Sequence, residues 1–156
     1  MIVDDIRTLP AYLADRASLM ALDLGSKTIG VAVSDDERRI ASSLDTIRRT
    51  KFTQDAKTLL TVVTDYDIAG FVLGLPVNMD GTEGPRCQSV RQFGANFADK
   101  TDLPIAFWDE RMSTQAVERH LIAQDVTRKR RASVIDKMAA QFILQGALDF
   151  LRNLAD

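Results

Sequence analysis

The apolar pattern of this chain changes its period once, and this change limits the folds that the chain can adopt. The first part holds three short apolar segments joined by brief polar links: residues 19–25, 28–35 and 40–47. Such segments are typical of strands, and their short links are typical of an antiparallel meander. Gly25 permits the tight turn between the first two segments.

After this meander, helical spacing alternates with apolar runs. The pattern predicts helices and strands in alternation: a helix over 53–66, a strand over 68–75, a helix over 85–100, a strand over 104–109, and helices over 113–124 and 133–153. Right-handed crossovers then give an α/β fold, a mixed five-stranded sheet of order 3-2-1-4-5 flanked by helices. In such sheets the functional site lies outside the carboxyl ends of the central strands, so the residues at these ends are the first candidates.

Length and composition favour one domain and exclude several kinds of site. The 156 residues fit a single domain at 19–156, with residues 1–18 as an N-terminal extension. No apolar run reaches the roughly 18–20 residues of a membrane span, and the start lacks the pattern of a signal peptide, so we expect a cytoplasmic protein without membrane contact. With only Cys87 and His120, neither a disulfide framework, a Cys/His zinc site nor a Ser-His-Asp triad has enough residues.

Carboxylates stand at the ends of two predicted strands. Asp23 interrupts an apolar strand that is expected to be central, where a buried charge needs compensation. A partner such as an arginine would provide it, but a bound cation is the stronger interpretation. Asp109 and Glu110 end the last strand, and because side chains alternate across a sheet, only one of them can face the same side as Asp23. These residues alone do not choose between the two.

A third carboxylate, Asp136, has two interpretations. Ser133-x-x-Asp136 fits a capping box at the start of a helix, and this structural role is the better supported of the two by the local pattern. If Asp136 instead joined Asp23 and Glu110, the three hard oxygen ligands would suit Mg²⁺ or Mn²⁺. Two such ions can clamp the attacking and leaving oxygens of a phosphodiester displacement, and this needs no protein nucleophile.

Basic clusters and a glycine-rich loop are further candidates for binding. The net charge is −2, but cationic side chains gather at 48–51 and 128–131. Each cluster is as well explained by solvated surface charge as by contacts with a phosphate backbone. The loop 73–86 is equally consistent with an ordinary crossover and with a flexible segment, Gly74 included, whose amides hold phosphate.

At four places, in order, the chain resembles the YqgF (RuvX) family of the ribonuclease-H-like superfamily. The segments are LDLGSKTIGVAVSD (22–35), LGLPVNMDGTEGPR (73–86), WDERMST (108–114) and IDKMAAQFILQGAL (135–148). The resemblance implies a ribonuclease-H-like fold and a catalytic, metal-binding set of Asp23, Glu110 and Asp136, with Asp109 as the alternative to Glu110. It also implies that Lys27, Asn78 and Arg111 contact phosphate or orient the acids, although Arg111 could instead pair with Asp109.

The same resemblance implies a nuclease that matures the 5′ end of precursor 16S ribosomal RNA. Structured RNA would then be held by 48–51 and by Arg128, Lys129, Arg130 and Arg131 beside the cleft. The main alternative is a resolvase of four-way DNA (Holliday) junctions, which should be a homodimer with two sites. Two weaker alternatives are an actin-like ATPase, which needs a second domain, and an RNA-binding module without activity.

Overall fold

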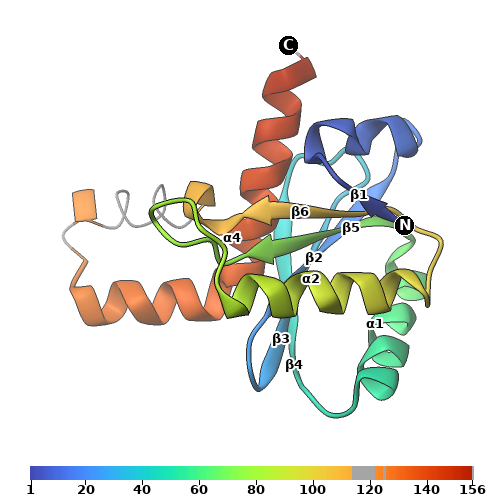
Figure 1. Cartoon of the computed structure of the whole chain (residues 1–156). Helices are drawn as coiled ribbons and strands as arrows, with labels where there is room; N and C mark the ends of the chain where they lie inside the picture. Colours follow the sequence, from blue (N-terminus) through green and yellow to red (C-terminus); the bar gives the residue numbers. More distant parts are fainter. Residues whose placement is uncertain (114–121, 125, 156) are drawn as a thin grey trace.

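The computed structural model describes residues 1–113, 122–124 and 126–155, and for residues 132–137 it describes the backbone only. One mixed sheet forms the centre, with helices on both of its faces (Figure 1). None of the described helices is long and apolar enough to cross a membrane.

The sheet has six strands in the order β1-β6-β5-β2-β3-β4. The strands are β1 (Ile2–Val3), β2 (Ser18–Leu24), β3 (Thr28–Ser34), β4 (Ala41–Arg48), β5 (Ile68–Leu75) and β6 (Ile105–Asp109). The five predicted strands and their order are confirmed, with β2 and β5 parallel at the centre. The sequence does not predict β1, because a strand of two residues is too short to show a period. It pairs in parallel with β6, Ile2 opposite Ile105, and so adds one strand at that edge.

The α-helices α1 (Phe52–Tyr66) and α2 (Pro85–Ala98) agree with the predicted ones, whereas α4 (Arg128–Ala155) differs at its start. The 3-10 helix η1 (Ile6–Tyr12) lies within the N-terminal extension, where no helix was predicted. Pro85 occupies the first turn of α2, as expected. The helix predicted over 113–124 lies largely outside the described residues.

Helix α4 begins five residues earlier than predicted, so the basic run 128–131 forms its first turn instead of a linker. The hydroxyl of Thr127 accepts a hydrogen bond from the Arg130 amide at 3.3 Å, as an N-cap residue does. Ser133 therefore lies inside the helix, and the capping box predicted from Ser133 and Asp136 is wrong. The Ser/Asp spacing is a short local signal, and Thr127 offers the same cap one and a half turns earlier.

Two apolar layers cover the two faces of the sheet. On one face α1 and α2 pack against β2 and β5; the Phe71 and Phe97 rings meet edge to face with centroids 4.9 Å apart. On the other face, α4 packs through Ile143 and Leu144 on alternate residues of the same strands. Because side chains alternate, Asp23 follows Leu19 and Ala21 onto the α4 face.

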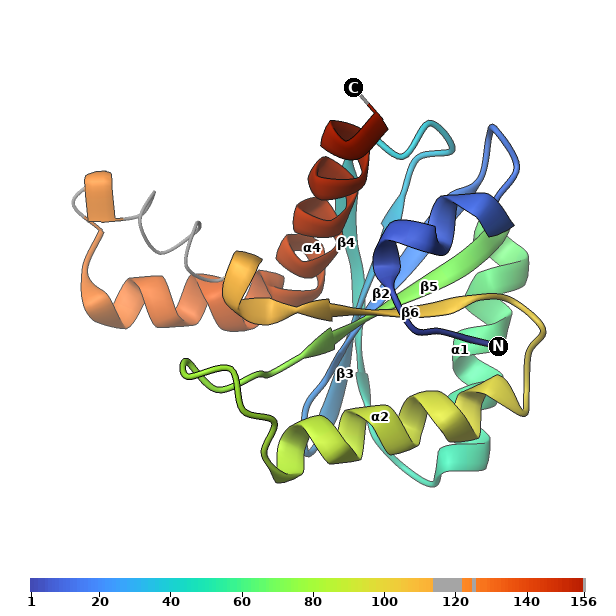
Figure 2. The ribbon, with the colours of Figure 1, turned by 45° about the horizontal axis from the view of Figure 1, so that its top comes forward.

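Helix α4 also reaches beyond the sheet. Its red C-terminal part lies against the strands, whereas its orange first turns extend past the carboxyl ends of β5 and β6 (Figures 1 and 2). The loop between β5 and α2 lies at this same edge (Figure 2). The end of β2, the loop after β5 and the first turns of α4 therefore lie at the same edge of the sheet.

Candidate active site

Asp23 stands at the carboxyl end of β2, half-buried beneath α4. It pairs across the strands with Gly30 of β3. A β-carbon at position 30 would lie 3.4 Å from the Asp23 Cβ and 3.5 Å from the Ala140 Cβ. Both distances are those of ordinary van der Waals contact, so the Gly30 backbone packs directly against the Asp23 side chain and the helix above it.

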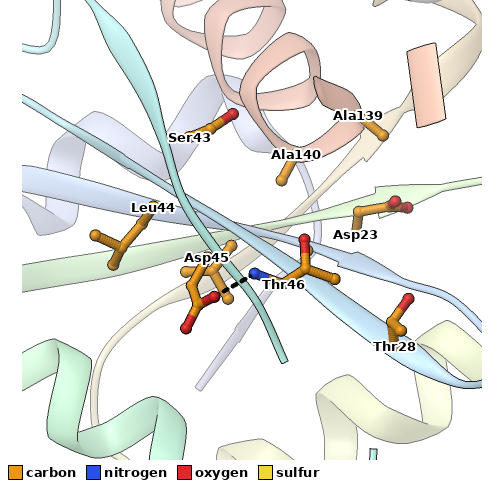
Figure 3. A pocket seen from close by; sticks show the side chains of 10 residues that line it. Asp23, Thr28, Ser43, Leu44, Asp45, Thr46, Ala139 and Ala140 are labelled. Atoms are coloured by element: carbon orange, nitrogen blue, oxygen red, sulfur yellow. Dashed lines mark hydrogen bonds between the residues drawn. The ribbon is translucent and has the colours of Figure 1, made fainter. Parts of the chain in front are cut away.

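A cavity of about 180 Å³ adjoins Asp23 between β3, β4 and α4. Thr28, Thr46 and Ser43 contribute hydroxyl groups to its wall, and Ala139 and Ala140 of α4 form its roof (Figure 3). Figure 3 shows Asp23 at one end of this hollow, on the side of Thr28 and Ala139. The carboxylate thus borders a polar space large enough for part of a ligand.

Glu110 follows the last residue of β6, and its side chain lies over Gly74 of the neighbouring strand β5. A β-carbon at position 74 would stand 3.0 Å from the Glu110 Cγ and 3.1 Å from its Cδ. Strand β5 separates β6 from β2, and the register pairs Leu22 with Leu73, so position 74 lies beside Asp23. A side chain that crosses Gly74 therefore extends from the end of β6 towards Asp23.

The electrostatics of Glu110 agree with this arrangement. Burial raises the pKa of the Glu110 carboxyl to about 7, and the Asp23 carboxylate adds to the rise, while Arg86 opposes it. Two carboxylates that repel one another in a half-buried site favour the binding of a proton or a cation. The site thus has the donor chemistry that a hard divalent cation requires.

Asp109 lies in different surroundings from Glu110. Arg111 forks onto it, with Nη2 donating to Oδ2 at 2.6 Å and Nε to Oδ1 at 3.1 Å. Burial raises the pKa of the Asp109 carboxyl, but the hydrogen bonds from Arg111 outweigh it and hold this pKa below its ordinary value. Arg111 also donates from Nη1 to the Met79 carbonyl at 3.3 Å, and so joins the strand end to the loop. This is the pairing role that was the alternative to phosphate contact for Arg111.

Asp136 belongs to the third turn of α4, and its side chain lies outside the described part of the structure. In sequence it stands one turn before Ala139, which lines the cavity beside Asp23. Its role as a ligand stays a prediction. Among the side chains that are described, no three His, Cys, Asp or Glu gather in one place.

The loop after β5 is held by its own hydrogen bonds. The Asn78 side-chain amide donates to the Thr82 hydroxyl at 3.1 Å, and Gly81 has a φ of 90°. The Asn78 amide nitrogen is therefore engaged inside the loop. Gly74 lies buried within β5, in agreement with the strand predicted over 68–75, and so it is not part of the flexible segment that was one interpretation of 73–86.

The basic residues lie around this edge of the sheet. Lys27 is exposed in the turn between β2 and β3, and its carbonyl accepts a hydrogen bond from the Arg49 amide at 2.9 Å, which brings 48–51 beside that turn. Arg128, Lys129 and Arg130 are exposed in the first turn of α4, while the half-buried Arg131 donates to the Val126 carbonyl at 2.7 Å.

Sequence reasoning missed two residues at this edge, Gly30 and Arg86, and it gave Gly74 a different role. The closeness of Glu110 to Gly74 could have been noticed, because glycine inside a strand often marks a close approach of other atoms. Arg86 gives no such signal, since an arginine in the first turn of a surface helix is unremarkable by pattern.

This chain is similar in sequence to known proteins over most of its length. A family model described as "RuvX: Holliday junction resolvase" matches residues 17–150. A protein of Paramagnetospirillum magneticum is 64% identical over 141 residues, 90% of this chain and 91% of that protein, and one of Phenylobacterium zucineum is 60% identical over 156 residues, 99% of this chain and 100% of that protein. Both carry the name "Putative pre-16S rRNA nuclease".

Solved structures agree on the fold. The RuvC protein of T. thermophilus in complex with a Holliday junction substrate superposes with a TM-score of 0.58 at 13% identity, covering 88% of this chain and 96% of that one. RuvC has the ribonuclease-H-like fold, so the predicted fold class is confirmed. The match of the family model over most of the chain, with relatives near 60% identity, shows that the chain belongs to the RuvX (YqgF) family.

Proposed function

We propose that this protein is a metal-dependent nuclease that hydrolyses phosphodiester bonds in the 5′-end maturation of pre-16S ribosomal RNA. The observation that carries the proposal is the placement of Glu110 across Gly74 towards Asp23. Burial of the Glu110 carboxyl, with a further contribution from the Asp23 carboxylate, raises its pKa to about 7. The name shared by the relatives at 60% and 64% identity supports the substrate. We propose the cytoplasm, where precursor ribosomal RNA is processed in bacteria, as the place of action.

The residues fit a divalent cation. Asp23 and Glu110 would supply oxygen ligands, and we propose Asp136 of α4 as the third. When bound, two Mg²⁺ or Mn²⁺ ions would supply an ionised water as nucleophile and stabilise the charge on the leaving oxygen. The chain itself contributes the orientation: Gly74 fixes the path of Glu110, and the pairing of β2 with β3 fixes Asp23.

Asp109 would support the site without binding the cation. It faces away from Asp23 by the alternation of β6, and its oxygens are engaged by Arg111. This supports Glu110 as the ligand from this segment.

The second candidate is the cleavage of four-way DNA junctions by a homodimer. The description of the family model favours it. Both candidates use the same carboxylates and differ in the nucleic acid that the surface around them holds.

A competition assay distinguishes the two substrates. Purified protein with Mn²⁺ would receive equal amounts of a precursor RNA fragment spanning the mature 16S 5′ end and a four-way DNA junction, each with its own fluorescent label. The proposal predicts that the RNA is cut first and at the mature end. Preferential cutting of the junction, together with a dimer in solution, would replace it with the second candidate.

A further inference from the structure

A basic pocket lies on the other side of the β2 end from the cavity of Asp23. It has a volume of about 310 Å³ and is formed by the end of β2, the β2–β3 turn, the segment after β4 and the first two turns of α2. We name it the Arg49–Arg86 pocket; its lining residues are Leu24, Gly25, Ser26, Arg49, Arg86, Ser89 and Val90.

The lining of this pocket suits an anion. Two arginines and the hydroxyls of two serines face it, and no acidic residue takes part. Lys27 adds a third positive charge beside it, in the same turn as Ser26. Guanidinium and hydroxyl groups are donors, and the planar arginine fork matches the oxygens of a phosphate.

Arg49 is held in place before any ligand binds. Its Nη1 donates to the Gly25 carbonyl at 2.6 Å, and its guanidinium lies 5.8 Å from the centre of the Phe93 ring. These contacts use one of its five N–H donors and the stacking face, so further donors remain for a ligand. A side chain that is already oriented loses less entropy on binding.

Arg86 connects the pocket to the candidate active site. It lines the pocket from the first turn of α2, and its positive charge also acts on the Glu110 carboxyl. Leu24, which also lines the pocket, directly follows Asp23 in β2, so the pocket lies beside the carboxylates and one nucleic-acid strand can contact both.

We propose that the Arg49–Arg86 pocket binds one backbone phosphate of the substrate strand, near the phosphate that is cleaved. This inference rests on the proposed function for the identity of the strand. The pocket recognises phosphate and not base, so it holds RNA and DNA equally and sets the position of the strand.

Equilibrium binding without metal tests the proposal apart from catalysis. The probe is a fluorescein-labelled oligouridylate of about 12 nucleotides, followed by anisotropy in EDTA over a KCl series. Arg49→Gln, Arg86→Gln and the double variant are compared with wild type. Lys100→Gln is the matched control, because it removes one exposed positive charge just beyond the other end of α2.

Each arginine variant is expected to weaken binding roughly tenfold at moderate salt, and Lys100→Gln less than about twofold. Because the two arginines hold one phosphate, the slope of log Kd against log salt should fall by about 0.7 in the double variant and by no more than that in either single variant. An oligothymidylate of equal length should give the same losses.

Losses of affinity in the arginine variants that are no larger than in Lys100→Gln would overturn the proposal. A fall of the salt slope by twice the expected amount in the double variant would also overturn it, because it would show two separate phosphate contacts instead of one pocket. Arg49 also stabilises the β2–β3 turn through its hydrogen bond to Gly25, so thermal unfolding is measured for each variant. If Arg49→Gln is unfolded, the result for Arg86→Gln decides the test. If the arginine variants weaken binding as expected but the wild-type protein cleaves no substrate, the phosphate-binding role of the pocket stands and only the proposed function is refuted.

Discussion

The side chain of Glu110 lies across Gly74, so closely that a β-carbon at position 74 would stand 3.0 Å from the Glu110 Cγ. The same β-carbon would stand 2.5 Å from the Cδ1 of Ile143, which packs from α4. Position 74 thus has two neighbours with different functions: one belongs to the core and the other to the candidate site. Substitutions here can separate folding from activity.

Gly74→Ala should lower both the stability and the activity of the protein. The new methyl group overpacks the contact with Ile143, which typically costs about 1–3 kcal/mol of unfolding free energy. It also displaces Glu110, so cleavage should fall by at least about tenfold, since small misplacements of catalytic groups are costly. Urea unfolding and initial cleavage rates measure the two effects.

The double variant Gly74→Ala/Ile143→Val provides the control. Valine lacks the Cδ1 atom that the methyl group meets, so stability should return in part while activity stays low. If activity returned together with stability, the position of Glu110 over Gly74 would not matter for the reaction.

The metal-free protein should show a pH dependence of stability that Glu110 causes. Its pKa is about 7 in the folded protein against an ordinary 4.5, so the folded state binds the proton more tightly than the unfolded state. The unfolding free energy should therefore fall as pH rises through this window. Glu110→Gln removes the effect, and its advantage over wild type in EDTA should grow by on the order of 2 kcal/mol between about pH 5 and pH 8. Parallel curves for the two proteins would contradict this.

Asp109→Asn and Glu110→Gln should differ in their effects on metal binding. Glu110→Gln should weaken Mn²⁺ binding in calorimetry roughly tenfold or more, because a ligand is lost. Asp109→Asn should leave Mn²⁺ binding within about twofold and cost about 1 kcal/mol of stability, since it breaks a partly exposed pair with Arg111. The reverse result would make Asp109 the ligand.

The sequence predicted most of the sheet, because periods of two and a change to helical spacing are properties of whole segments. It did not predict β1, which is too short for a period, nor the start of α4, where Thr127 caps the helix in place of Ser133. For the site, the alternation of side chains along β6 predicted that only one of Asp109 and Glu110 could face Asp23. The choice depends on contacts between strands distant in sequence, with Gly74 and with Arg111, and no local pattern records them.

The basic first turn of α4 should hold nucleic acid through charge alone. Replacing Arg128, Lys129 and Arg130 by glutamine should weaken the binding of single-stranded RNA and lower its salt slope by up to about 2, or 0.7 for each lost phosphate contact. Salt titrations by anisotropy measure this, with the exposed residues Arg7, Arg16 and Lys57 replaced together as the control for net charge. Equal effects of both triple variants would mean that the position of the run is unimportant.

The first measurement to make is metal-dependent cleavage of a precursor RNA fragment by wild type and Asp23→Asn, purified in parallel. We expect cutting that requires Mn²⁺ or Mg²⁺, stops in EDTA, and falls by about a thousandfold or more in the variant. Cleavage by Asp23→Asn at the wild-type rate, with the variant folded by circular dichroism, would contradict the assignment of these carboxylates as the active site.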